Sequence, residues 1–209
     1  MKRSYYSNLP AYVRYDKDLP SACKLFWAEL TSHRDENGYI FAGNKYFCEL
    51  LGVSSRTLMR WLKVLQEKNY ILVEYVATKT GRKRYISIVE QSVPLEKFLA
   101  EEAEPQEDKP HFDAIIPSEI RWTKDLSDSA KILYAEIRAL CGIFANCTAS
   151  NKYFENLYGV DKQSVKNWLN ELEERQIIER YYVYAGGQLS KEQYDLRLEK
   201  RIIRLVKMS

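Results

Sequence analysis

The chain has 209 residues, 45% of them hydrophobic and 29% charged, and 32 Lys+Arg against 29 Asp+Glu leave a formal net charge of +3. This composition is typical of a folded globular protein and argues against wholesale disorder. No stretch approaches the roughly 20 apolar residues of a membrane span, and the first ten residues lack the apolar run of a signal peptide. We therefore expect a cytoplasmic protein without a membrane partner.

Residues that could ligate a soft metal are few and scattered. They are Cys23, Cys48, Cys141, Cys147, His33 and His111. They contain no C-x-x-C pair and none of the histidine spacings of zinc sites, so we expect no metal. The chain also lacks the glycine-rich motifs that cradle nucleotides, and we find no catalytic constellation. The sequence thus predicts no cofactor and no enzymatic activity.

Residues 1–92 predict three helices followed by a β-hairpin. The helices cover about residues 20–32, 44–51 and 55–68, with Gly52 ending the second and Ser54 as N-cap of the third. Strands over 70–76 and 84–89 flank a turn at 77–82 that contains Gly81. A helix, a helix-turn-helix and then a hairpin is the order of a winged helix.

Residues 93–112 read as a linker. They contain three prolines, and two basic residues against six acidic ones give a charge of −4. A short helix over Leu95–Ala103 is the only element expected there.

Residues 113–209 repeat the order of the first 92. A helix over 127–140 with Ser127 as N-cap is followed by a short helix and then by a third helix capped by Asp161. Strands over 177–184 and 198–206 are separated by a connection from Ala185 to Asp195 that is ten residues longer than in the first copy. Charge distinguishes the copies, because residues 1–92 carry +6 (15 basic, 9 acidic) and residues 113–209 only +1 (15 basic, 14 acidic).

A constant offset of 107 residues relates the two copies. It carries Pro10 to Pro117, the run at 44–47 (NKYF) to 151–154, and Trp61-Leu62 to Trp168-Leu169. A period this long does not fit solenoid repeats. The predicted fold is mainly α with small β-hairpins (α+β): tandem duplicated winged helix-turn-helix domains at 1–92 and 113–209, joined by the acidic linker 93–112.

The third helix of each copy carries the candidate DNA-reading residues. Leu58, Trp61, Leu62 and Leu65 form an apolar stripe, which leaves an opposite polar face. Arg, Lys, Asn and Gln on such a face can pair with base edges or grip phosphates. The candidates are Ser55, Arg56, Arg60 and Lys63, with Met59 on the same face, and in the second copy Lys162, Gln163, Lys166, Asn167 and Asn170. A merely solvated helix face is the alternative.

Further candidates lie on the wing and on the second helix. Lys79, Arg82, Lys83 and Arg84 cluster around the first hairpin turn, where they could follow the DNA backbone or guard an edge strand. Asn44 and Lys45, with Asn151 and Lys152, open the second helices and could bind a phosphate or serve capping and packing. Two roles remain open for a further set of cations, which could contact the DNA backbone or form local ion pairs. They are Arg14 and Lys17, with Arg121 and Lys124.

The stretch from Asn44 to Leu65 matches the pattern N-K-Y-F-x-x-L-x-G-V-S-x-x-T-[LV]-x-R-W-[LI]-x-x-L. It resembles the N-terminal helix-turn-helix domain of replication initiators and replisome organisers from phages and mobile elements of low-GC Gram-positive bacteria. The resemblance covers most of residues 5–90 and, more loosely, 113–182. It implies origin-type DNA binding through Ser55, Arg56, Thr57, Arg60 and Lys63. Many such proteins continue with a helicase-loader-interacting domain, whereas a second winged helix follows here, as in a class of plasmid initiators.

These observations favour sequence-specific binding of double-stranded DNA in the initiation of phage or plasmid replication. The protein could also bind replisome proteins or form a homodimer. A transcriptional regulator on the same scaffold is an alternative that the residues do not separate from the first. Another is an adaptor whose second winged helix binds protein, because that copy is nearly neutral.

Overall fold

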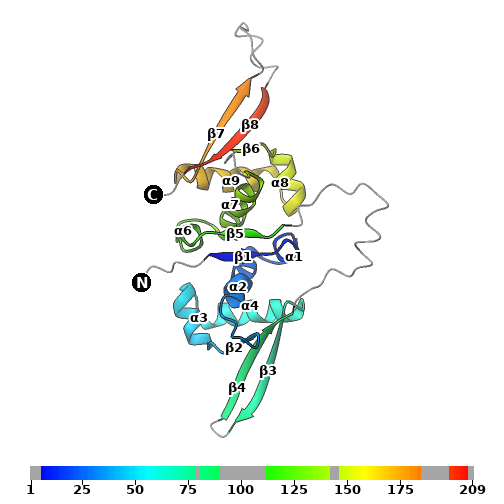
Figure 1. Cartoon of the computed structure of the whole chain (residues 1–209), viewed down its shortest axis with the longest axis vertical. Coiled ribbons are helices and arrows are strands. Elements are labelled where there is room, and N and C mark those ends of the chain that lie inside the picture. The colour runs from blue at the N-terminus through cyan, green and yellow to red at the C-terminus, as the bar shows by residue number, and fades with distance from the viewer. Residues whose placement is uncertain (1–5, 79–80, 90–111, 142–145, 185–197, 207–209) are drawn as a thin grey trace, which may run out of the picture. The chain divides into compact units, whose positions relative to one another are not determined.

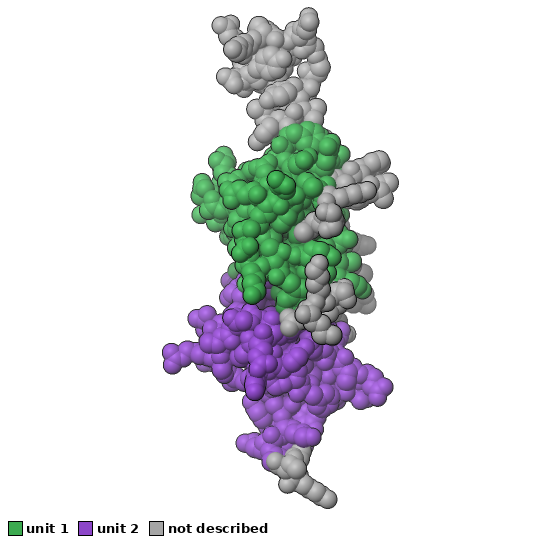
Figure 2. Space-filling view, turned by 90° about the vertical axis from the view of Figure 1, so that its left-hand side faces the viewer, with its two compact units in different colours: residues 1–17, 111–209 green, residues 18–110 purple. Residues whose placement is uncertain are grey.

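The computed structural model describes residues 6–78, 81–89, 112–141, 146–184 and 198–206. The chain forms two compact units: residues 18–110 make up one, and residues 1–17 together with 111–209 make up the other (Figures 1 and 2). We refer to residues 18–89 as repeat 1 and to residues 125–206 as repeat 2, which begins 107 residues later and contains the ten-residue-longer connection. The expected linker helix at 95–103, Lys79 and the connection at 185–195 lie outside the described residues.

Repeat 1 has the predicted helices and a three-stranded antiparallel sheet in the order β2-β4-β3. Its elements are α2 (Ser21–Thr31), β2 (Tyr39–Ile40), α3 (Asn44–Leu51), α4 (Ser55–Glu67), β3 (Ile71–Thr78) and β4 (Gly81–Ile88). The strand β2 was not predicted, because two residues carry no measurable alternation. The hairpin is also longer than predicted, since Thr78 pairs with Gly81 and the ladder continues through the expected turn.

The core of repeat 1 is built where α2, α3 and α4 meet. The rings of Phe26 and Phe47 lie edge to face at 5.5 Å, and Trp61 lies 5.7 Å from Phe26. Leu58 and Leu65 of α4 are fully buried beside them. Interlocked aromatic rings of this kind fix the angle at which α4 is held, because few other rotamers fill the same space.

The second unit contains elements equivalent to those of repeat 1, at an offset of 107 residues up to β7 and of 117 residues for β8, with a sheet in the order β6-β8-β7. Its elements from residue 111 onward are β5 (Ala114–Ile116), α6 (Ser118–Arg121), α7 (Asp128–Cys141), β6 (Asn146–Cys147), α8 (Asn151–Tyr158), α9 (Lys162–Glu174), β7 (Ile178–Tyr184) and β8 (Leu198–Leu205). The hydroxyl of Ser127 accepts from the Ala130 N–H at 3.2 Å, as its predicted capping role requires. Figure 1 shows the hairpin β7–β8 extending from the helices like the wing β3–β4 of repeat 1.

The N-terminal segment belongs to the second unit, although its sequence belongs to the first copy. Its elements are β1 (Ser7–Leu9) and α1 (Ala11–Arg14). Strand β1 pairs antiparallel with β5, with Asn8 opposite Ile115. These two residues are themselves 107 apart, so equivalent strands of the two copies pair about a local two-fold centre. The unit boundary at Lys17/Asp18 thus differs from the domain 1–92 expected from the sequence.

The architecture is a tandem pair of winged helix-turn-helix domains, as the sequence predicted. In both copies a left-handed glycine, Gly52 (φ 68°) or Gly159 (φ 64°), ends the second helix and turns the chain into the third. Only a residue without a Cβ adopts this conformation without cost. The third helices, α4 and α9, are therefore presented in the same way in the two repeats.

Candidate nucleic-acid interface

Helix α4 is anchored on one side and open on the other. The side chain of Ser54 caps it by accepting from the Thr57 N–H at 3.2 Å, and Leu58, Leu62 and Leu65 are buried. Ser55, Arg56, Met59, Arg60 and Lys63 are exposed. The predicted reading face of repeat 1 is therefore solvent-facing on a rigidly held helix.

Two predicted members of this face differ in how they are held. Thr57 is half-buried, and its hydroxyl lies 3.0 Å from the Ser54 hydroxyl, so it completes the helix cap instead of standing on the open face. Lys63 pairs with Glu67 at 3.6 Å, but both side chains are well exposed. Such a surface ion pair contributes little to stability, so Lys63 can leave the Glu67 carboxylate and bind a phosphate instead.

Helix α9 of repeat 2 shows the same division. Asp161 caps it by accepting from the Ser164 N–H at 2.6 Å, and Val165, Leu169 and Leu172 are buried. All five predicted side chains of this helix are exposed: Lys162, Gln163, Lys166, Asn167 and Asn170. The cores of α4 and α9 agree, while their open faces carry different chemistry.

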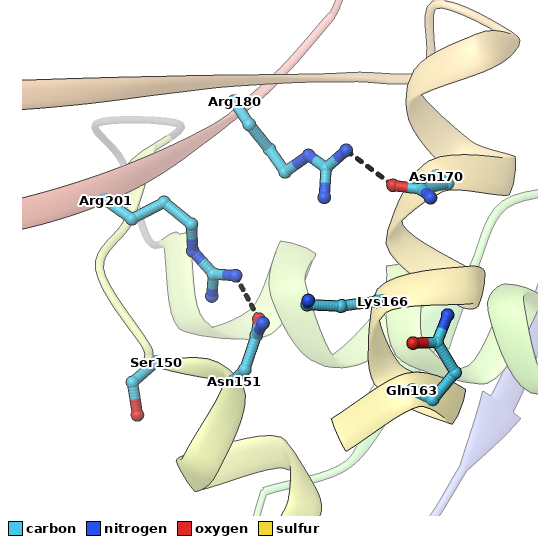
Figure 3. A pocket seen from close by; sticks show the side chains of 7 residues that line it. All are labelled: Ser150, Asn151, Gln163, Lys166, Asn170, Arg180 and Arg201. Carbon is cyan, nitrogen blue, oxygen red and sulfur yellow. Dashed lines mark hydrogen bonds between the residues drawn. The ribbon is translucent and has the colours of Figure 1, made fainter. Parts of the chain in front are cut away.

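An arginine on the wing is tied to the second helix in both repeats. In repeat 1 the Arg84 guanidinium donates to Asn44 Oδ1 and, at 3.0 Å, to the carbonyl of Ala42. In repeat 2 Arg201 makes the equivalent bonds to Asn151 Oδ1, which Figure 3 shows, and to the carbonyl of Ala149. We call this arrangement the wing latch. It joins strand β4 or β8 to the start of α3 or α8.

The wing latch changes the role expected for three predicted DNA contacts. Asn44, Asn151 and Arg84 hold the scaffold together, and burial lowers the pKa of Arg84 from its usual value. Arg201 was not among the predicted residues. Its signal was present, since an offset of 117 aligns Lys83-Arg84 with Lys200-Arg201, but no local pattern shows what the arginine would contact.

Next to the wing latch, repeat 2 has a polar pocket (Figure 3). It is lined by Ser150, Asn151, Gln163, Lys166, Asn170, Arg180 and Arg201. Arg180 projects from β7, donates to Glu173 Oε2 at 2.9 Å and to Asn170 Oδ1 at 2.7 Å, and so binds the wing to α9. The bond with Arg180 holds the pKa of the Glu173 carboxyl below its usual value. Arg180 was missed by sequence reasoning because repeat 1 has Val73 in its place.

The corresponding pocket of repeat 1 is more apolar. It is lined by Phe41, Ala42, Gly43, Asn44, Met59, Tyr75, Lys83 and Arg84. Met59 stands where repeat 2 has Lys166, and its sulfur accepts from Asn44 Nδ2 at 3.0 Å. The two repeats thus present a common frame around chemically different pockets.

Four other predicted cations lie on the surface, whereas the candidates Arg14 and Arg121 are buried. Arg82 and Lys83 are exposed on the first wing, with the Arg82 guanidinium carbon 5.6 Å from the centre of the Tyr75 ring. Lys45 is exposed at the start of α3. Lys152, at the start of α8, pairs with Glu155 at 3.6 Å and keeps a side chain that is 74% exposed. All four can reach a polyanion without breaking a buried contact.

Within the described part of the chain, no three His, Cys, Asp or Glu side chains gather in a way that could hold a metal ion. In the same residues no helix has both the length and the apolar character needed to span a membrane.

Comparison with protein families gives two matches. A family model described as a helix-turn-helix domain matches residues 17–71 and again 124–178. The two matches are 107 residues apart, at the offset read from the sequence, and each contains the capped third helix. No curated protein matches the chain.

Proposed function

Because the chain belongs to the helix-turn-helix domain family, a family of DNA-binding domains, we propose that it is a non-enzymatic cytoplasmic protein that binds specific double-stranded DNA through both repeats. The observation that carries this proposal is the pair of capped helices with matching buried stripes and different open faces. If the open faces only contacted solvent, there would be no reason for both repeats to have the same helix cap, buried stripe and wing latch.

We place this binding in the initiation of phage or plasmid replication. The support is the resemblance of Asn44 through Leu65 to replication initiators and replisome organisers, in which DNA binding positions other proteins at an origin. Replisome proteins and a second copy of the chain are the partners this role would involve. A transcriptional regulator would bind DNA in the same way. The two roles are distinguished by testing whether a plasmid that carries the origin needs the protein in order to replicate.

Fluorescence anisotropy of the full chain on duplex DNA tests the binding itself. The double variant Arg56→Ala/Arg60→Ala should weaken binding to a selected site at least tenfold, because each well-made pair with a base edge is worth about 1–3 kcal/mol. Gln66→Ala, an exposed change near the other end of α4, is the matched control and should bind normally. Equal affinity of the double variant and the control, with both folded by circular dichroism, would contradict the proposal.

A further inference from the structure

We infer that the two repeats read unlike half-sites: repeat 1 selects guanine and repeat 2 selects adenine. This inference rests on the proposed function and names the bases that each helix recognises. It is argued from the hydrogen-bonding groups that each open face leaves available. The major groove distinguishes the two purines, because guanine offers two acceptors, O6 and N7, whereas adenine offers the acceptor N7 and the donor N6.

Repeat 1 presents only donors at its two central reading positions. Arg56 and Arg60 lie one helical turn apart, so they share a face, and both are exposed. Among the described residues neither guanidinium forms an ion pair. A guanidinium carries five N–H donors and no acceptor, so it fits guanine O6 and N7 and meets the adenine amino group donor against donor.

Repeat 2 has amides at the same two positions. At the offset of 107, Gln163 replaces Arg56 and Asn167 replaces Arg60. Gln163 Nε2 donates to Asn167 Oδ1 at 2.8 Å, which orients both amides. This bond leaves the Gln163 carbonyl as an acceptor and the Asn167 amino group as a donor. One donor beside one acceptor is the complement of the adenine edge.

The pocket of repeat 2 extends this pattern. Arg180 donates to Asn170 Oδ1 and is itself held by Glu173, so the Asn170 oxygen is directed at the arginine and the amino group is the part that we assign to a base. Figure 3 shows Asn170, Lys166 and Gln163 following one another along α9, with Asn170 bonded to Arg180 of the wing. Repeat 1 has Lys63 and Val73 in place of Asn170 and Arg180, and cannot form this arrangement.

The arginines near α9 do not restore a preference for guanine. Arg180 donates through Nε and Nη2 to Glu173 and Asn170, and Arg201 donates through Nη1 and Nη2 to Asn151 and Ala149, so both guanidinium groups are held within the scaffold. Lys162 and Lys166 remain exposed, and we assign them to phosphates, where a flexible point charge suffices. The DNA target is therefore asymmetric, with one block read by guanidinium groups and the other by amides.

Selection from a library of random 30-base-pair duplexes, with the full chain, tests the inference. The wild type should enrich sites with two blocks. Gln163→Ala/Asn167→Ala should abolish a tenfold to hundredfold preference for adenine in one block and leave guanine in the other unchanged. Arg56→Ala/Arg60→Ala should do the reverse. Gln163→Arg/Asn167→Arg should convert the adenine positions to guanine.

The outcomes of this selection distinguish a failure of the base assignment from a failure of the proposed DNA binding. Enriched sites in which the amide variant keeps its adenine, or loses guanine instead, would overturn the inference while leaving DNA binding in place. A single enriched block, untouched by the amide variant, would also overturn it and would favour a protein partner for repeat 2. A library from which the wild type enriches nothing would remove the proposed function. Glu174→Ala, an exposed change on α9, is the control and should select the wild-type site.

Discussion

Arg14 and Glu136, which are 122 residues apart, form a buried ion pair with Nε and Oε2 separated by 2.7 Å and both side chains fully buried. The remaining guanidinium donors reach the carbonyls of Leu9 and Phe112 and the hydroxyl of Tyr15, which in turn donates to the Glu136 carboxylate at 3.0 Å. The pair joins the N-terminal segment to α7. The sequence left Arg14 open between a DNA contact and a local ion pair, and the structure makes it neither.

Removing one partner of this pair should destabilise the protein strongly. Arg14→Met leaves the Glu136 carboxylate buried without its counter-charge, which costs about 3–5 kcal/mol in comparable cases. Urea unfolding of the full chain, followed by tryptophan fluorescence, measures the loss. The double variant Arg14→Met/Glu136→Leu, which removes both charges, should recover part of it. A single variant as stable as the wild type would show that the pair carries no such energy.

The cations of the first wing should fall into two groups, with Arg82 and Lys83 contacting DNA and Arg84 holding the scaffold together. Arg82→Ala/Lys83→Ala should weaken binding to all sequences alike and lower the slope of log K against log salt by up to about 2, since each phosphate contact contributes about 0.9. Their exposure predicts an almost unchanged free energy of unfolding.

Arg84→Ala is the matched change on the same strand. It breaks the wing latch and leaves Asn44 and the Ala42 carbonyl without their donor, so we expect a stability loss of about 1–3 kcal/mol and an unchanged salt slope. Identical effects of the two variants on slope and stability would contradict the division of roles.

The two left-handed glycines form a natural pair for substitution. Gly52→Ala should cost about 1–2 kcal/mol, the penalty for placing a Cβ in this conformation. Gly159→Ala should cost slightly more, because its Cβ would lie 2.6 Å from Lys17 Cδ. Adding Lys17→Ala should remove only this excess. Chemical denaturation of the three variants checks the difference, and a Gly159→Ala variant more stable than Gly52→Ala would oppose it.

Asp161 should make the stability of repeat 2 depend on pH in the acid range. Hydrogen bonds from Ser164 lower its pKa below the usual value for Asp, near 3.8. The folded state therefore releases this proton more readily than the unfolded state. The stabilising contribution is complete above the unfolded pKa and is lost as the pH falls through the folded pKa.

Asp161→Ser isolates this effect, since repeat 1 uses Ser54 at the same position and serine does not titrate. The wild type should lose stability relative to this variant between about pH 5 and pH 2, as measured by urea midpoints. A difference between the two proteins that is constant over this range would count against the carboxylate as the source.

The repeat made most of the fold predictable. An offset of 107 supplied each of the three predicted helices twice, although the short helices α1 and α6 were not predicted. The caps Ser54 and Asp161 and the glycine at position 52 placed the ends of α3, α4 and α9 within a residue or two. The open faces of α4 and α9 were also predicted, because a buried stripe of period 3.6 defines the opposite side of a helix.

The interactions between distant residues could not be predicted. Strand β1 has only three residues, and its pattern does not distinguish a partner in its own copy from the equivalent strand in the other. The wing latch likewise depends on where Arg84 and Asn44 meet in space, 40 residues apart. An isolated cation in a basic hairpin looks the same in sequence whether it faces phosphate or a carbonyl.

The pairing of Asn8 with Ile115 means that the linker is not the only connection between the two halves of the chain. A protease site introduced near residue 100 would cut the polypeptide in two, yet the N-terminal product would still contribute a strand and a buried arginine to the other product. We expect the nicked fragments to co-elute in size-exclusion chromatography and to separate in denaturant. Covalent continuity and structural integrity are thus distinct properties here, and a C-terminal fragment that begins in the linker would lack the part of its unit that residues 1–17 supply.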